Sequence, residues 1–346
     1  MRILLTVDPE IPVPPPHYGG IERIVDGIAT ELCLRGHAVG LVAHPASKCP
    51  VERLFAWPRG ASGGLRDGIA NSLALLNAVR QFHPGVVHSF SRLGYLVPLL
   101  ALRIPTIMSY QRHTGGRKLA IAQALGGRRF EFTALSEFIA AMGRRGGGRW
   151  SVVPNFSDTG FYRYTAEVPA DAPLVFLSRI ERIKGAHTAI EIATQAGRRL
   201  IIAGNRVETG DGPRYWRDEI EPRLEPGKVD YAGPVNDEQK NDLLGGAAAM
   251  IVPIEWDEPF GIVFAEALAC GTPVISCPRG ALPEIVRSGE HGFLVKSIAE
   301  GVAAVAGLPR ISRAACRARC EQLFSQRAVV GQYEDLYRRL APAGAT

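Results

Sequence analysis

Residues 253–283 read PIEWDEPFGIVFAEALACGTPVISCPRGALP, and this stretch decides the fold. Glu258 lies in a loop, and Gly261 then opens the apolar run IVFAEALAC. That run predicts a buried helix, which Gly271 and Pro273 end. An acidic loop, a helix start and a second acid inside the helix therefore follow one another closely along the chain.

The start of this helix is suited to binding a phosphate group. The first N–H groups of a helix have no intrahelical partner, and the helix dipole adds a partial positive charge there. The amides expected to face the phosphate belong to Phe260, Gly261, Ile262 and Val263. Glu266 could then reach the ribose of the same nucleotide, and Glu258 lies on the side where a sugar beyond the phosphates would be. Two exposed acids with chance spacing are the alternative interpretation.

Two cations stand at the beginning of the second half of the chain. The segment PLVFLSRIERIKGAHTAIEIA predicts a strand followed by a helix, with Arg179 and Lys184 on either side of the turn and Gly185 at the helix start. Both cations can converge on a pyrophosphate. An ordinary pair of surface cations is the alternative.

The N-terminal residues predict a strand, a helix and a second strand, but they contain no G-x-G-x-x-G, so we expect no nicotinamide or flavin site. Gly19 and Gly20 stand before the helix, and paired glycines let the backbone approach an anion; a plain turn is the alternative. The strand PGVVHSF contains His88 near its end, where the side chain would point into the crevice at the carboxyl edge of the sheet. A structural, hydrogen-bonded histidine is the other interpretation.

Length and composition favour a soluble protein of two domains. The chain has 346 residues, of which 46% are hydrophobic and 21% charged. This length suits two domains of roughly 150 to 180 residues, and no stretch approaches the ~18 apolar residues of a membrane span. The start, MRILLTVD, lacks the longer apolar core and cleavage site of a signal peptide, so we expect a cytoplasmic location.

The six cysteines bear on disulfide and metal sites, and the net charge of +6 bears on the kinds of ligand that the protein could bind. The cysteines contain no CxxC pair, so we expect neither a disulfide nor a zinc site. The positive charge permits nucleotide phosphates, anionic lipid or an acidic glycan as partners, but no nucleic-acid-binding motif accompanies it. The basic loop GRRGGGR, with GGRRF before it, could touch an acceptor or an anionic membrane, in the latter case the inner face of the membrane; an ordinary solvated loop is the alternative.

The pattern E-P-F-G-x-x-x-x-E from Glu258 to Glu266, with EALACGTPVIS and PEIV after it, resembles glycosyltransferase family 4. The segment from Arg179 to Gly185 resembles that family's GR-x4-KG, with Ser178 in place of the usual glycine. GGIERIVDGIATELCLRGHAV resembles its N-terminal loop. The resemblance implies the GT-B fold, an α/β architecture of two Rossmann-like domains, each a doubly wound parallel sheet, facing across a cleft. The expected parts are an acceptor-side domain at 1–165, a nucleotide-sugar-binding domain at 170–325 and a helix at 326–346 that crosses back to the first domain.

The resemblance also implies an activity and its residues. It implies a hexosyltransferase-type enzyme that moves a sugar from a nucleotide-sugar, by default a UDP-sugar, with retention of configuration and with neither metal nor other cofactor. The catalytic residues carried over are Glu258, His88, Arg179 and Lys184. The donor-binding residues carried over are Gly19, Gly20, Arg179, Lys184, Val235, Glu258, Phe260, Gly261, Ile262, Val263 and Glu266. Many members have a further histidine where this chain has Gln111, and His113 stands two residues on.

Two other functions remain open at this point. A nucleotide-sugar 2-epimerase would share the architecture but would need no acceptor. A sugar-nucleotide-binding subunit without catalysis would be a non-enzymatic alternative. The acceptor, a glycan, a lipid-linked saccharide or a small molecule, is not indicated by the motifs.

Overall fold

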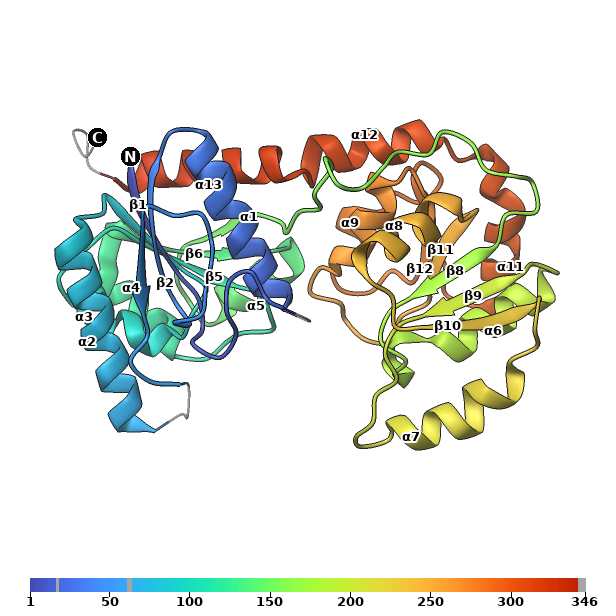
Figure 1. Cartoon of the computed structure of the whole chain (residues 1–346), viewed down its shortest axis with the longest axis horizontal. Coiled ribbons are helices and arrows are strands. Elements are labelled where there is room, and N and C mark those ends of the chain that lie inside the picture. The colour runs from blue at the N-terminus through green and yellow to red at the C-terminus, as the bar shows by residue number, and fades with distance from the viewer. Residues whose placement is uncertain (17–18, 61–63, 342–346) are drawn as a thin grey trace. The chain divides into compact units, whose positions relative to one another are not determined.

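The computed structural model describes residues 1–16, 19–60 and 64–341. The chain forms two compact units, the first of Met1–Asn155 with Gln326–Thr346 and the second of Phe156–Ser325. Residues 342–346, the end of the expected C-terminal segment, lie outside the described part. Helices lie on both faces of a parallel sheet in each unit (Figure 1). The expectation of two Rossmann-like α/β domains is confirmed.

The described residues of the first unit form a seven-stranded sheet in the order β3-β2-β1-β4-β5-β6-β7, in which every pair is parallel. Its elements are β1 (Arg2–Thr6), α1 (Gly20–Leu34), β2 (Ala38–Ala43), β3 (Arg53–Ala56), α2 (Leu65–Phe82), β4 (Val86–Ser89), η1 (Leu93–Leu96), α3 (Val97–Ala101), β5 (Thr106–Tyr110), α4 (Lys118–Gly126), η2 (Gly127–Arg129), β6 (Phe130–Ala134), α5 (Glu137–Arg145), β7 (Trp150–Val152) and α13 (Gln326–Leu340). Strand order reverses direction between β1 and β4, so loops leave this point on opposite sides and open a crevice.

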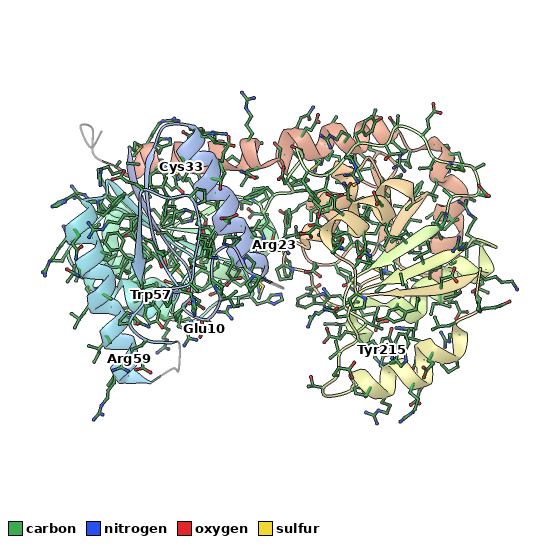
Figure 2. All side chains as sticks on the ribbon, viewed as in Figure 1. Glu10, Arg23, Cys33, Trp57, Arg59 and Tyr215 are labelled. Atoms are coloured by element: carbon green, nitrogen blue, oxygen red, sulfur yellow. The ribbon has the colours of Figure 1, made fainter. Side chains whose placement is uncertain are left out.

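Burial explains why these segments take their places in the first unit. The buried side chains of α1 include Ile24, Val25, Ile28 and Leu32, which recur at helical spacing and so share one face. Helix α1 packs beside α13, whereas α2, α3 and α4 pack against one another in sequence. Trp57, labelled in Figure 2, follows β3 and is buried. Its indole N–H donates to the carbonyl of Val7 over 2.7 Å. The indole thereby ties the ends of two strands together.

The described residues of the second unit form a six-stranded parallel sheet in the order β10-β9-β8-β11-β12-β13. Its elements are β8 (Leu174–Leu177), η3 (Arg182–Lys184), α6 (Ala186–Gln195), β9 (Leu200–Ala203), α7 (Gly212–Tyr215), η4 (Trp216–Ile220), η5 (Glu221–Arg223), β10 (Val229–Gly233), α8 (Asp237–Gly246), β11 (Ala249–Val252), α9 (Ile262–Ala269), β12 (Val274–Ser276), α10 (Leu282–Ile285), β13 (Gly292–Leu294), α11 (Ile298–Gly307), η6 (Leu308–Arg310) and α12 (Arg313–Leu323). Here the order reverses between β8 and β11.

Helix α9 is the predicted helix of the apolar run, and it is buried as its composition requires. Its apolar side chains from Phe264 to Ala269 need cover, and α12 and α8 pack against α9. The guanidinium of Arg317 donates to the carbonyl of Ala269 at the end of α9 over 2.7 Å. It also donates to the carbonyls of Thr159 and Tyr162 over 2.8 Å each. These bonds explain why residues 156–165, assigned to the first domain from the sequence, group with the second unit instead.

Of the helices in the described part of the chain, none combines the length and the apolar character that crossing a bilayer requires.

Arg313 supplies a test of how α12 holds this unit together. Its guanidinium donates to the carbonyls of Thr165, Ala247 and Gly245 over 2.7, 2.9 and 3.0 Å. Arg313→Met keeps the aliphatic stem but leaves these acceptors without their donor, so we expect the free energy of unfolding to fall by about 2 to 4 kcal/mol in urea titrations. Arg214→Met is the matched control, since Arg214 is exposed and pairs with Asp211; a change within about 0.5 kcal/mol is expected. Equal losses in the two variants would contradict this role for Arg313.

Candidate functional site

The centre of the candidate site is a buried ion pair between the loops that follow β8 and β11. Lys184 donates from Nζ to Oε2 of Glu258 over 2.6 Å, and only 12% and 10% of the two side chains are exposed. The indole N–H of Trp256 donates to the same oxygen over 3.0 Å, and the Lys184 ammonium lies 4.7 Å from the Trp256 ring centre. These loops flank the reversal of strand order, where open α/β sheets bind their ligands. Two predicted site residues, Lys184 and Glu258, are thus in direct contact.

The turn that carries Lys184 is fixed against the loop after β11. Gly185 has φ +78°, and a Cβ there would lie 2.0 Å from the carbonyl oxygen of Pro253. The N–H of Glu255 donates to the carbonyl of Ile183 over 2.8 Å. Only glycine allows this conformation and this approach, so the backbone holds Lys184 next to the acidic loop.

An aromatic side chain supports the other side of this turn. This side chain is Tyr215, on α7, which Figure 2 labels. Its hydroxyl accepts from the backbone N–H of His187 over 3.1 Å and lies 2.9 Å from the Nδ1 atom of that histidine. The guanidinium of Arg182 lies 5.0 Å from the Tyr215 ring centre and pairs with Glu219 over 2.7 Å. Burial raises the pKa of Tyr215 to about 12, so the hydroxyl stays protonated at neutral pH.

The loop that carries Glu258 depends on a second glycine, to which the sequence analysis assigned no role. Gly280 has φ +57°, and a Cβ there would lie 2.2 Å from the carbonyl oxygen of Glu258. The N–H of Ala281 donates to that oxygen over 2.8 Å. The glycine in PRGALP is the sequence signal that could have indicated this contact. Trp256 was also missed, although its place two residues before Glu258 offered a hint.

The start of α9 is where the sequence analysis predicted a phosphate contact, and that contact stays a prediction. Gly261 is the N-cap with φ +80°, and Phe260 before it is buried. Ile262 and Val263 form the first turn and are half-buried. The first amides of a helix have no acceptor within it, so this end remains suited to an anion.

Glu266 is held by the protein itself. Its Oε1 accepts from Nζ of Lys240, on α8, over 2.7 Å, and Lys240 also pairs with Asp237 over 3.3 Å. Burial, followed by the nearby Glu266 carboxylate, raises the pKa of Tyr162. The contact with a ribose predicted for Glu266 stays a prediction, and it would be made by a carboxylate that a lysine already orients.

Arg179 and Val235 lie at the edges of this arrangement. Arg179 is half-exposed and pairs with Glu181 over 3.0 Å. Arg179 and Lys184 therefore pair with different carboxylates, and their convergence on one pyrophosphate stays a prediction. Val235 is half-buried in the loop after β10, at the carboxyl edge of the same sheet.

Gly19 and Gly20 lie in the first unit, where Gly20 is the first residue of α1. Carboxylates gather near this helix start. Glu22 is buried, and its pKa is raised by burial and, to a smaller extent, by Asp8 and Glu10. A buried acid in the first turn competes with an external anion, so the phosphate contact predicted for the two glycines stays a prediction.

His88 lies in the interior of the first unit, and the expectation that it points into a crevice is wrong. Its side chain is fully buried, with Nδ1 2.7 Å from the Tyr337 hydroxyl on α13 and Nε2 2.7 Å from the Ser109 hydroxyl on β5. Burial lowers the pKa of His88 to about 3, so the ring is neutral at physiological pH. The alternative interpretation, a structural and hydrogen-bonded histidine, is the one that the structure supports. Strand β4 is covered on both faces, so the His88 ring has no path to solvent.

Within residues 1–16, 19–60 and 64–341, no three His, Cys, Asp or Glu side chains are grouped closely enough to hold a metal ion.

Comparison with family models places glycosyltransferase domains in both halves of the chain. Residues 166–309 match the model described as "Glycosyl transferases group 1", and residues 18–161 match "Glycosyltransferase Family 4". The first match contains Arg179, Lys184, Val235, Glu258 and Glu266. The family resemblance drawn from the motifs is thus supported at the level of the glycosyltransferase domains.

Individual proteins agree with these matches. The chain is 25% identical to a glycogen synthase of Mycobacterium tuberculosis, over 94% of this chain and 91% of that protein. Among solved structures it is similar to AviGT4, a glycosyltransferase involved in avilamycin A biosynthesis, with 27% identity, a TM-score of 0.73, and coverage of 99% of this chain and 98% of AviGT4. HepE of Anabaena, solved with UDP-glucose, shares the fold with 20% identity and a TM-score of 0.65, over 97% of this chain and 98% of HepE.

Gly280 tests whether the backbone contact positions Glu258. In Gly280→Ala the new Cβ collides with the carbonyl of Glu258, and the alanine is held at an unfavourable φ. We therefore expect the free energy of unfolding to fall by about 2 to 4 kcal/mol. Gly289→Ala is the control, because Gly289 has φ +87° but no atom within 4 Å of the added Cβ. The control carries only the cost of positive φ, about 1 to 2 kcal/mol. Urea unfolding of both variants should rank them in this order, and the reverse order would refute the contact.

Proposed function

We propose that this chain, a GT-B glycosyltransferase by its domains and fold, transfers a sugar from a nucleotide-sugar, by default UDP-glucose or a close relative, with retention of configuration and without a metal ion. The observation that carries the proposal is the buried contact of Lys184 with Glu258 beside the start of α9. A cation and a helix N-terminus suit the diphosphate of a nucleotide-sugar, and a carboxylate beside them suits the sugar at the bond that breaks.

Lys184 and the start of α9 would bind the diphosphate. When the bond to the sugar breaks, negative charge grows on the diphosphate, and an ammonium group held in a site shielded from water stabilises that charge strongly. Arg179 would add a second cation from the same strand-to-helix turn. In this role the three groups replace the metal ion that other nucleotide-sugar enzymes use.

Glu258 would act on the sugar. The diphosphate would replace Glu258 as the partner of Lys184 and leave the carboxylate facing the anomeric carbon, where positive charge develops as the leaving group departs. Trp256 keeps one carboxylate oxygen oriented through its indole N–H. Glu266 and Val235 would hold the ribose and the base, which do not change during the reaction.

Two alternatives use the same site differently. A 2-epimerase would convert the nucleotide-sugar without any acceptor, and a binding subunit would hold it without releasing the nucleoside diphosphate. Incubation with UDP-glucose separates the three, since the transferase alone should release UDP faster as a suitable acceptor is added.

The role of Lys184 predicts how UDP binds. Lys184→Ala removes a charge-assisted hydrogen bond of about 1.5 to 3 kcal/mol, so the UDP dissociation constant should rise about 10- to 150-fold in calorimetry. Lys228→Ala, which removes an exposed lysine of the same unit, is the control and should bind like the unmodified protein. UDP affinity should be the same in EDTA and in magnesium. An unchanged affinity in Lys184→Ala would exclude this assignment.

The two glutamates should have different kinetic effects. Glu258→Gln should lower kcat by about ten- to a thousand-fold, because its contact strengthens in the transition state, while UDP affinity should not fall, since UDP lacks the sugar. Glu266→Gln should raise KM for UDP-glucose with kcat nearly preserved, because the ribose contact is equal in both states. UDP release from UDP-glucose provides the rate. Equal kcat values for Glu258→Gln and the unmodified protein would sink the catalytic role.

A further inference from the structure

The first unit contains a cavity of about 880 Å³, which is separate from the candidate site around Lys184 and Glu258. It lies at the carboxyl ends of β4 and β5, between η1 and α3 on one side and α4 on the other. Its volume falls within the range of about 300 to 1,000 Å³ that small-molecule sites occupy. The cavity is large enough for a ligand and belongs to one unit alone.

Apolar side chains form both the floor and the mouth of this cavity. Phe90, Leu100 and Met108 line it and are buried. Ile121 and Leu125 line it from α4, yet 60% and 41% of these side chains are exposed. Large apolar side chains exposed at the opening of an apolar cavity indicate a ligand whose body is itself apolar.

The charged groups at this cavity all have one sign. Arg92, Arg112 and Lys118 line it, and among the described residues no aspartate or glutamate does. Residues 68–130, which contribute most of the wall, include no acidic residue at all. An anionic group is therefore favoured at the mouth.

Two of these cations are available to a ligand. Arg92 already pairs with Glu10 over 3.4 Å. Arg112 and Lys118 are exposed, and within the described part of the chain neither forms an ion pair. Arg112 is close enough to Asp8 for its charge to oppose the burial-driven rise of the pKa of that carboxyl. An anion at this position would therefore gain contacts to Arg112 and Lys118 without breaking an ion pair that either makes within the described residues.

We propose that this cavity binds an anionic amphiphile, with its apolar body between α3 and α4 and its anionic group at Arg112 and Lys118. If the proposed function is correct, this ligand is the acceptor of the sugar, and the acceptor class is an apolar molecule that carries an acidic group, such as a lipid phosphate. The apolar part of the lining favours such a body over a purely polar saccharide, because hydroxyls placed against it would lose their hydrogen bonds to water.

Decyl phosphate, used as a monomer below its micelle concentration, tests the proposal by calorimetry with the full chain. We expect saturable binding that decanol shows more weakly and inorganic phosphate does not show. Ile121→Gln should weaken the binding of decyl phosphate at least fivefold. Leu102→Gln is the matched control, since Leu102 is also 60% exposed but does not line the cavity.

A second pair of variants tests the charge. Lys118→Gln should weaken the binding of decyl phosphate at least threefold and leave the binding of decanol unchanged. Arg117→Gln removes the neighbouring cation, which does not line the cavity, and should change neither. Absence of binding, or equal losses in Ile121→Gln and Leu102→Gln, would overturn the proposal. So would binding that appears only above the micelle concentration.

UDP binding measured on the same samples separates the two proposals. If the protein binds UDP but not decyl phosphate, this site is refuted and the proposed donor function is unaffected. Decyl phosphate binding without UDP binding would refute the donor function and keep the amphiphile site.

Discussion

The buried contact between Lys184 and Glu258 is the interaction on which the site of the second unit depends. Removing two charges from water costs several kcal/mol for each, and their attraction offsets this only when the geometry is good and further hydrogen bonds are made. The 2.6 Å separation and the Trp256 indole supply both. The contact also requires two loops to approach closely, and Gly185 and Gly280 permit this because neither carries a side chain.

This ion pair also explains how Lys184 can keep its position in the site before an anionic ligand binds. A buried ammonium without a partner is costly, whereas the hydrogen bond to Glu258 compensates Lys184 and holds it in place. A diphosphate can then take over the partner's role in a position already formed. Preorganised charge of this kind needs little rearrangement at the moment of reaction.

The two units share a topology but differ in chemistry at the corresponding edge of the sheet. In the second unit, charged side chains meet at the reversal of strand order. In the first, the nearby cavity is apolar with cations at its mouth, and His88 is sealed beneath α13 by Tyr337. Fold similarity alone therefore says little about what each edge binds, since the loops and their side chains set the chemistry.

The sequence by itself determined the two parallel sheets, the helix at Ile262–Ala269 and the presence of Lys184 and Glu258 in loops, because periodicity and glycine placement act over a few residues. Only the tertiary structure decided which of these groups meet. Lys184 and Glu258 are 74 positions apart and touch because β8 pairs with β11. His88 and Tyr337 are 249 apart, and no local pattern reveals that α13 would seal the histidine. The environment of a side chain is set by segments that are distant in the chain, so burial and partners follow from the packing of whole elements rather than from neighbours in sequence.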